Sequence, residues 1–413
     1  MLSQEALDNL VEPIVVRQQA INEYVIRIIC KRVNEIGHLL PSDIHRLERL
    51  LRMGADVKKI NAEIAKQTGL QVQDIKKLIR DIAYDAYVDA KPFYDYRHKP
   101  FIDFEDNKPL QQIVNAVANQ TADTYLNMSK AQAFMIRDLK NPKILKPTSI
   151  AKTYQTVVDE AIQSVQSGVV DYNTAMRRTV QQLADSGLRY VEYNTESGRR
   201  YTQRMDTAVR RNLLDGVRAI NQGVQDEVGK QFGADGKEIT VHANPAPDHA
   251  PVQGHQFSNE EYEKLQGDED ETFKDVEGRV YQHFDRHIGT LNCRHFTYSI
   301  IIGFSNPNYT DKQLAKILAD NDRGYTLPNG KHLTMYECTQ EQRKMETQVR
   351  YAKDGQIAAR EAGDDELAMK YQAKINELTK KYKAFSEACG LSPKPVKMRV
   401  PGYRKISTRS SSK

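Results

Sequence analysis

The pattern that most constrains the fold of this chain is a helical repeat between Arg199 and Phe232. Apolar residues in this segment recur at steps of three and four, at Met205, Val209, Leu213, Val217, Ile220, Val224 and Val228. That spacing lines them along one face of a single long helix, and such a face must be buried against other elements. Helical patterns also run through residues 1–90, 110–139, 149–188 and 339–389. The sequence therefore predicts a mainly α protein.

Length and composition narrow the class of protein. A chain of 413 residues can hold two or three domains with their own cores. Hydrophobic residues make up 39% and charged residues 28%, which favours a soluble protein with large solvated helical faces. No run approaches the roughly 18 apolar residues of a transmembrane helix, so we expect no membrane anchor. The four cysteines are far apart, which predicts no disulfide framework and indicates a reducing compartment.

A different pattern interrupts the helices between Glu238 and Ser305. Six of the ten histidines and one of the four cysteines fall within this stretch. Short β-like runs at residues 239–241 and 296–302 lie on either side of two turns and an acid-rich insert. We expect the two halves to close on each other across the insert and to form a small α+β module.

Breaks in the periodicity divide the chain. Lys91–Pro109 has three prolines and five aromatic residues without a helical period. This predicts a loop or extended arm whose rings dock on its own helices or on a neighbouring subunit. Asn329-Gly330 predicts a tight hairpin turn. We predict five regions: a long helical N-terminal region at 1–148, a helical connector at 149–237, the α+β module at 238–336, a charged helical hairpin at 337–390 and a basic tail at 391–413.

The order of residues in the module resembles the phage minor capsid protein 2 family. The resemblance is carried by His242, His249, Gln253, Gly254, Asn292, Cys293, Arg294 and His295, followed by a hydrophobic run that ends in Gly303-Phe304-Ser305. That family is related to the Mu-F-like head morphogenesis proteins, which lie at or near the portal of tailed-phage heads.

The resemblance implies a structural minor head protein. It would be made in the host cytoplasm and located in the virion near the portal vertex. Its implied partners are the portal protein and the major capsid protein, with packaged DNA as a further one. The implied role is in head assembly, DNA packaging or DNA ejection, without catalysis.

Four side chains in the module are candidate metal ligands. His249, His255, Cys293 and His295 supply enough imidazole and thiolate donors for a tetrahedral structural zinc ion. Their spacing matches no standard zinc finger. The alternative is that the histidines are buried and hydrogen-bonded to backbone carbonyl groups, in which case the protein needs no cofactor.

Two enzymatic alternatives use the same residues. Cys293 could act as a nucleophile, with His249 as its base. Asp248, His249, Asn292 and His295 could instead serve a phage-encoded metal-dependent nuclease or hydrolase. No Gly-rich oxyanion turn follows Cys293, and the element order does not fit a ββα-metal nuclease. We therefore expect the side chains of the motif to pin the turns through hydrogen bonds.

Two basic segments are candidate contacts for nucleic acid or for an acidic partner. The net charge of +5 is too small to indicate such a role by itself. The distribution is more informative, because residues 391–413 contain seven lysines and arginines and no acid. The alternatives are a solvated helical face and a frayed tail. The candidates are Arg199, Arg200, Arg204, Arg210, Arg211, Lys394, Lys397, Arg399, Arg404 and Lys405.

Overall fold

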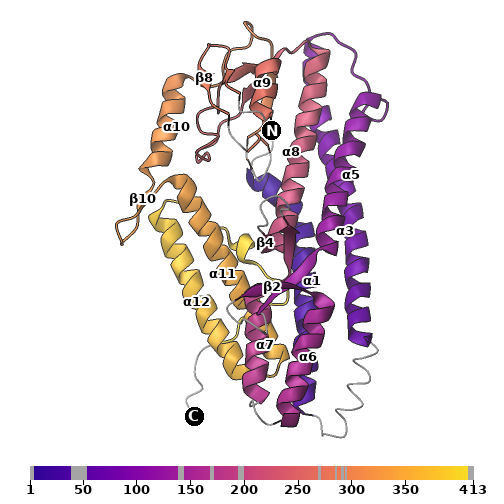
Figure 1. Cartoon of the computed structure of the whole chain (residues 1–413). Helices are drawn as coiled ribbons and strands as arrows, with labels where there is room; N and C mark the ends of the chain where they lie inside the picture. Colours follow the sequence, from indigo (N-terminus) through magenta and orange to yellow (C-terminus); the bar gives the residue numbers. More distant parts are fainter. Residues whose placement is uncertain are drawn as a thin grey trace. The chain divides into compact units, whose positions relative to one another are not determined.

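The structure is a computed structural model, and helices dominate it (Figure 1). It describes residues 4–38, 54–137, 144–167, 172–193, 200–267, 271–283, 286–289, 293 and 295–407. The chain forms two compact units, each assembled from three separate segments. Unit 1 consists of Met1–Val11, Gln73–Thr124 and Arg211–Gln340, and unit 2 of Glu12–Val72, Tyr125–Arg210 and Glu341–Lys413. The mainly α prediction is confirmed, whereas the five-region division stays a prediction.

The long N-terminal helices are α1 (Gln4–Gly37), α3 (Ala55–Val88) and α5 (Lys108–Lys130). The predicted apolar repeat forms α8 (Met205–Gln231), and all seven residues of its stripe are buried. The helix begins later than Arg199, because Arg200–Arg204 forms strand β4 instead. Residues 39–53 of the helical pattern predicted over 1–90 lie outside the described residues.

The aromatic stretch after α3 is only partly a loop, because α4 covers Lys91–Tyr96. Pro92 sits in the first turn of this helix, where a missing backbone N–H costs nothing. The rings pack within unit 1: Phe101 stacks on Tyr87 at 4.7 Å between centroids, and Tyr94 meets Phe232 edge-on at 4.8 Å. The prediction of a loop or extended arm is therefore wrong for α4. The prediction that the rings dock on the chain's own helices is confirmed except for Tyr96, which is 77% exposed.

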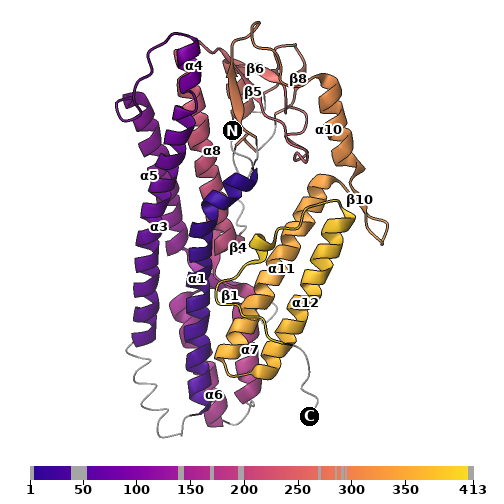
Figure 2. The ribbon, with the colours of Figure 1, turned by 180° about the vertical axis from the view of Figure 1, so that it is seen from behind.

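The α+β module lies in unit 1. Its sheet has the order β6-β5-β9, with β5 (Gly236–Ile239) antiparallel to both β6 (Gln256–Ser258) and β9 (Thr297–Ile300) (Figure 2). The connecting segment carries α9 (Asn259–Gln266) and the short pair β7 (Phe273–Lys274) and β8 (Val280–Tyr281). The hydrophobic core of the module contains Ile239, Val252, Phe257, Tyr262, Leu265, Phe273 and Ile288.

The rest of the module contains a helix and a hairpin. Helix α10 (Asp311–Arg323) starts at a capping box in which Thr310 is the N-cap. The predicted hairpin at Asn329-Gly330 is formed by β10 (Tyr325–Thr326) and β11 (His332–Leu333).

Unit 2 contains a four-stranded antiparallel sheet that the sequence did not predict. Its order is β2-β1-β3-β4, built from β1 (Gln132–Arg137), β2 (Leu145–Ser149), β3 (Arg189–Tyr193) and β4 (Arg200–Arg204). Helices α6 (Ile150–Ser167) and α7 (Tyr172–Ser186) contact β1. The predicted continuous helix up to Leu139 is therefore wrong beyond Lys130.

The predicted C-terminal hairpin is confirmed as α11 (Met335–Glu361) and α12 (Asp365–Ala388), which lie side by side (Figures 1 and 2). Gly363, at a φ of 73°, and the N-cap Asp364 make the break between them. The chain then continues through a short 3-10 helix, η1 (Pro395–Met398), which packs on the hairpin through Met398.

Among the described residues, no helix combines enough length with enough apolar character to span a membrane.

Candidate functional site

Three of the four candidate metal ligands meet in the module. His249, Cys293 and His295, which we call the His–Cys cluster, place their donor atoms within 4.8 Å of one another. His249 lies in the turn that follows β5, and the other two precede β9. Antiparallel pairing of Ile239 with Thr297 brings these two segments together. The expectation that the halves of the module close across the insert is thus met.

The sulfur of Cys293 is the centre of the cluster. Its Sγ atom is 3.3 Å from Nδ1 of His249 and 3.3 Å from Nδ1 of His295. Cys293 is 4% exposed, and each histidine is 1% exposed. A soluble substrate therefore has no direct access to the sulfur.

Hydrogen bonds on the far side of each ring fix the histidine tautomers. Nε2 of His249 is 2.6 Å from the backbone carbonyl oxygen of Arg286, which can only accept a hydrogen bond. Nε2 of His295 is 3.2 Å from Oε1 of Gln253. The backbone N–H of His242 also donates to that Oε1, which identifies it as the amide oxygen. Both Nε2 atoms must therefore carry the proton, and both Nδ1 atoms present a lone pair to the same sulfur.

Burial decides the charge of the cluster. It raises the pKa of the Cys293 thiol, and neighbouring backbone N–H groups and arginines only partly offset it. Burial also lowers the pKa of His249. The pKa of His295 lies well below its usual range, because burial and the nearby His242 and His249 all disfavour a positive charge on its ring. Without a metal ion the cluster is neutral near pH 7. This state is unsuited to a thiolate nucleophile, which needs a lowered thiol pKa and access.

His255 is not part of the cluster. Its ring faces Arg279, and its Nδ1 is 3.7 Å from a carboxylate oxygen of Asp275. Among the described residues the possible ligands that meet are therefore three and not four, because the turn directs the His255 ring toward the ion pair between Arg279 and Asp275 instead.

Gln253-Gly254 has a clear structural role. Gly254 has a φ of 77°, a conformation that L side chains rarely adopt. A Cβ atom there would lie 2.5 Å from Leu314 and 2.9 Å from Val241. The glycine therefore allows the turn to lie close to both side chains. In this position the amide oxygen of Gln253 lies next to Nε2 of His295.

The sequence did not single out Arg286. Its guanidinium makes two hydrogen bonds to Asp248, at 2.9 and 2.6 Å, while its carbonyl accepts from His249. Arg286 thus fixes the turn that carries Asp248 and His249 through both its side chain and its backbone. No pattern in the sequence predicted this role. Asn292 and Arg294 lie outside the described residues, so their roles stay predictions.

The basic candidates near α8 fall into different environments. Arg204 is 4% exposed and is paired with Asp206 and Asp354 in unit 2. This corrects the expectation of a surface contact for Arg204, because a buried and paired guanidinium does not reach a partner. Arg210 pairs with Glu12 at 2.5 Å. Arg211 is half-buried, whereas Arg199 and the side chain of Arg200 lie outside the described residues.

The basic tail is docked rather than frayed over residues 391–407. Side chains of α11 donate hydrogen bonds to its backbone: Arg350 to the carbonyl of Lys397, Lys353 to that of Met398 and Gln356 to that of Arg404. Met398 and Val400 are buried. The side chains of Arg399, Arg404 and Lys405 are exposed, and those of Lys394 and Lys397 are half-buried.

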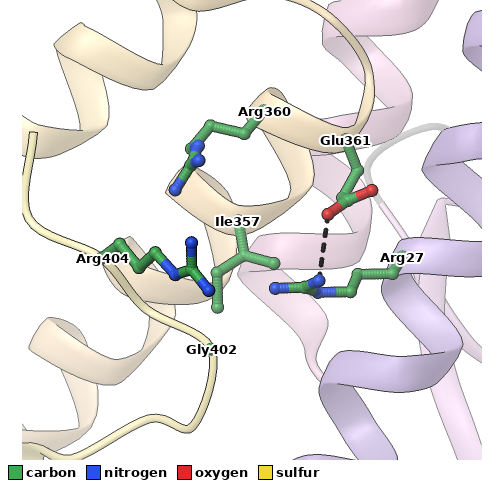
Figure 3. Close-up of a pocket in the computed structure, with 6 residues that line it drawn as sticks. All are labelled: Arg27, Ile357, Arg360, Glu361, Gly402 and Arg404. Carbon is green, nitrogen blue, oxygen red and sulfur yellow. Dashed lines mark ion pairs between the residues drawn. The ribbon is translucent and has the colours of Figure 1, made fainter.

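Arg404 lines a pocket of about 240 Å³ in unit 2 (Figure 3). Arg27 and Arg360 line the same pocket, together with Ile357, Glu361 and Gly402. Glu361 is the single carboxylate among these residues, and it pairs with Arg27 at 3.2 Å. The lining of this pocket is therefore cationic.

Comparison with known protein families gives a match over nearly the whole chain. The profile of the family described as Phage minor capsid protein 2 matches residues 2–387. No curated protein and no solved structure matches the chain. Because the match covers nearly the whole sequence, the chain belongs to the phage minor capsid protein 2 family and is a structural protein of the bacteriophage virion.

Proposed function

We propose that this protein is a portal-associated minor head protein that acts in head assembly, DNA packaging or DNA ejection. The observation that carries the proposal is the family match over residues 2–387. The order of the histidines, Cys293 and the Gln253-Gly254 turn supports the finer placement, because it resembles proteins related to the Mu-F-like head morphogenesis group. The portal protein and the major capsid protein are the proposed partners.

We propose that the module is a folding unit without catalytic turnover. The burial of Cys293, His249 and His295 supports this role. So do the hydrogen bonds that tie each ring to a neighbouring turn. A nuclease or hydrolase would need the same donors to face a substrate.

The exposed basic residues are proposed contacts for packaged DNA or an acidic portal surface. The strongest support is the pocket at Arg404, which is lined by three arginines and one carboxylate. The planar guanidinium group of arginine can donate two parallel hydrogen bonds to either a phosphate or a carboxylate group. Lys394, Lys397, Arg399 and Lys405 belong to the same docked segment and extend this candidate surface.

Cross-linking of purified virions tests the position in the head. We expect mass spectrometry to find peptides of this chain linked to the portal protein, and asymmetric reconstruction to place its density at the portal vertex. Virions that lack the polypeptide, or links confined to tail proteins, would contradict the proposal.

A nuclease assay separates the enzymatic alternative. The purified chain would be incubated with double- and single-stranded DNA in the presence of Mg²⁺, Mn²⁺ or Zn²⁺. We expect no multiple turnover. Sustained cleavage that disappears in a folded His295→Asn variant would establish an enzyme.

A further inference from the structure

We propose that the His–Cys cluster binds one zinc ion, through Nδ1 of His249, Sγ of Cys293 and Nδ1 of His295, and that this ion staples the two halves of the module together. The inference goes beyond the proposed function, which requires no metal. It also holds or fails independently of where the protein lies in the virion.

The distances fit coordination by a single ion. A sulfur at about 2.3 Å and an imidazole nitrogen at about 2.1 Å from a tetrahedral zinc ion lie about 3.6 Å apart. Both S···N distances in the cluster are 3.3 Å. The ligand atoms of the three residues all lie within 4.8 Å of one another, and bringing the two nitrogens to about 3.4 Å would place all three donors on tetrahedral positions around one ion.

The number of protons that the three side chains can share favours a metal ion over hydrogen bonds alone. Both Nδ1 atoms act as acceptors, because each Nε2 proton is directed to an oxygen of Arg286 or Gln253. A thiol carries one proton, so Cys293 can donate to only one of the two nitrogens. A shared cation satisfies both nitrogens and the sulfur together.

The outer partners of the rings match those of metal-bound histidines. Such histidines usually donate their second N–H to a carbonyl or carboxylate oxygen, which fixes the tautomer and orients the ring. The Arg286 carbonyl does this for His249, and the Gln253 amide oxygen does it for His295. Arg286 is itself held by Asp248, so the support extends one shell further out.

The donor set selects the metal. One thiolate and two imidazoles favour a borderline-soft ion such as Zn²⁺ over Mg²⁺ or Ca²⁺, which prefer oxygen ligands. On binding, Cys293 releases its thiol proton to solvent and both imidazoles coordinate in their neutral form. His249 and Cys293 are separated by α9, β7 and β8, so the ion would close a long loop in a small module.

Metal content and cobalt substitution of the untagged full chain test the proposal. After growth with added zinc, we expect about one zinc per chain by mass spectrometry of the metal. Replacement by Co²⁺ should give a thiolate-to-cobalt charge-transfer band in the near ultraviolet and visible bands of tetrahedral intensity. Cys293→Ser should abolish the thiolate band.

Matched variants make the assignment specific. Cys338→Ser removes another buried cysteine, and His255→Asn removes the histidine that the geometry excludes, so both should keep the band. Gln253→Met should weaken metal affinity about 10- to 100-fold by removing an outer partner. Folding of each variant is monitored by circular dichroism.

The wild-type measurement decides the matter even where Cys293→Ser fails to fold. A folded wild-type chain that stays metal-free after zinc supplementation, and shows no thiolate band with Co²⁺, would overturn the proposal. A band that persists in Cys293→Ser, or disappears in His255→Asn, would overturn the ligand set.

Discussion

At the scale of single residues, unit 2 contains a buried set of charges, which we call the ion-pair network. Arg204 contacts Asp206 at 3.2 Å and Asp354 at 2.9 Å, and Arg350 is 3.3 Å from Asp206. Each of the four residues is less than a tenth exposed. Burial of charge is costly, so each member depends on its partners. The network links β4, α8 and α11, and its loss should therefore lower the stability of unit 2 as a whole.

Removing Arg204 tests this dependence. We expect Arg204→Met to lower the free energy of unfolding by about 3–5 kcal/mol, because it leaves two buried carboxylates with one remaining arginine. Urea unfolding followed by circular dichroism measures the change. Arg399→Met removes an exposed arginine and should stay within about 0.5 kcal/mol of wild type. Equal effects of the two substitutions would show that the network adds nothing.

The pH dependence of stability tests Asp206 separately. Burial alone would raise the pKa of Asp206, but Arg204 and Arg350 outweigh burial and hold that pKa well below its usual value. The resulting stabilisation is present above the unfolded pKa of about 3.9 and is lost as the pH falls through the folded pKa. Asp206→Asn should therefore be less stable than wild type at pH 7, and this difference should shrink below about pH 4. A difference that stays constant with pH would contradict the assignment.

At the scale of elements, the contact between α11 and α12 depends on one small residue. A Cβ atom at Gly355 would lie 2.3 Å from a ring carbon of Tyr371. Gly69, in α3, has nothing within 4 Å of such an atom. Both glycines are in helices, where alanine is otherwise the better residue. The two positions therefore separate packing from helix propensity.

We expect opposite signs for the two alanine substitutions. Gly69→Ala should stabilise the protein by about 0.5–1 kcal/mol through reduced backbone entropy in the unfolded chain. Gly355→Ala should destabilise it by about 1–3 kcal/mol, because the ring of Tyr371 must move. Thermal unfolding of the two variants beside wild type measures both changes. A stabilised Gly355→Ala variant would show that the helices separate at no cost.

The elements that the sequence predicted are those specified locally. The α8 stripe and the Asn329-Gly330 turn each depend on residues close together in the chain. Strand β1 was missed because Gln132, Ala133 and Phe134 are buried in succession, so the strand shows no alternation and continues the helical pattern of α5. Its partner β3 follows more than fifty residues later, and local spacing does not reveal such a pairing.

The candidate site was predictable in its residue types but not in its grouping. Cys293 and His295 are two positions apart, but His249 lies more than forty residues earlier, so only the fold brings it to them. The exclusion of His255 depends on where Arg279 and Asp275 lie after folding. The part played by Arg286 depends on a backbone carbonyl, which every residue has and which carries no sequence signal.

At the scale of the whole molecule, the balance of charge limits how DNA could be bound. The 60 basic residues are nearly matched by 55 acidic ones, so long-range attraction to DNA is weak. Many of the basic side chains already have acidic partners, as Arg204 and Arg210 do. Binding therefore depends on local groups in which cations outnumber acids, of which the pocket at Arg404 is the best candidate.

The salt dependence of DNA binding tests that pocket. The slope of log affinity against log salt falls by about 0.9 for each phosphate contact that is removed. If the pocket holds phosphate, the double variant Arg360→Gln/Arg404→Gln should have a shallower slope by about 1–2 and a weaker affinity at low salt. Arg80→Gln/Arg323→Gln removes the same charge from side chains paired with Glu105 and Asp320, and it should leave the slope unchanged. Equal losses in the two double variants would mean that net charge alone attracts DNA. An unchanged slope in the first variant would move the proposed contact away from Arg404, because counterion release counts phosphates at the residues that touch them.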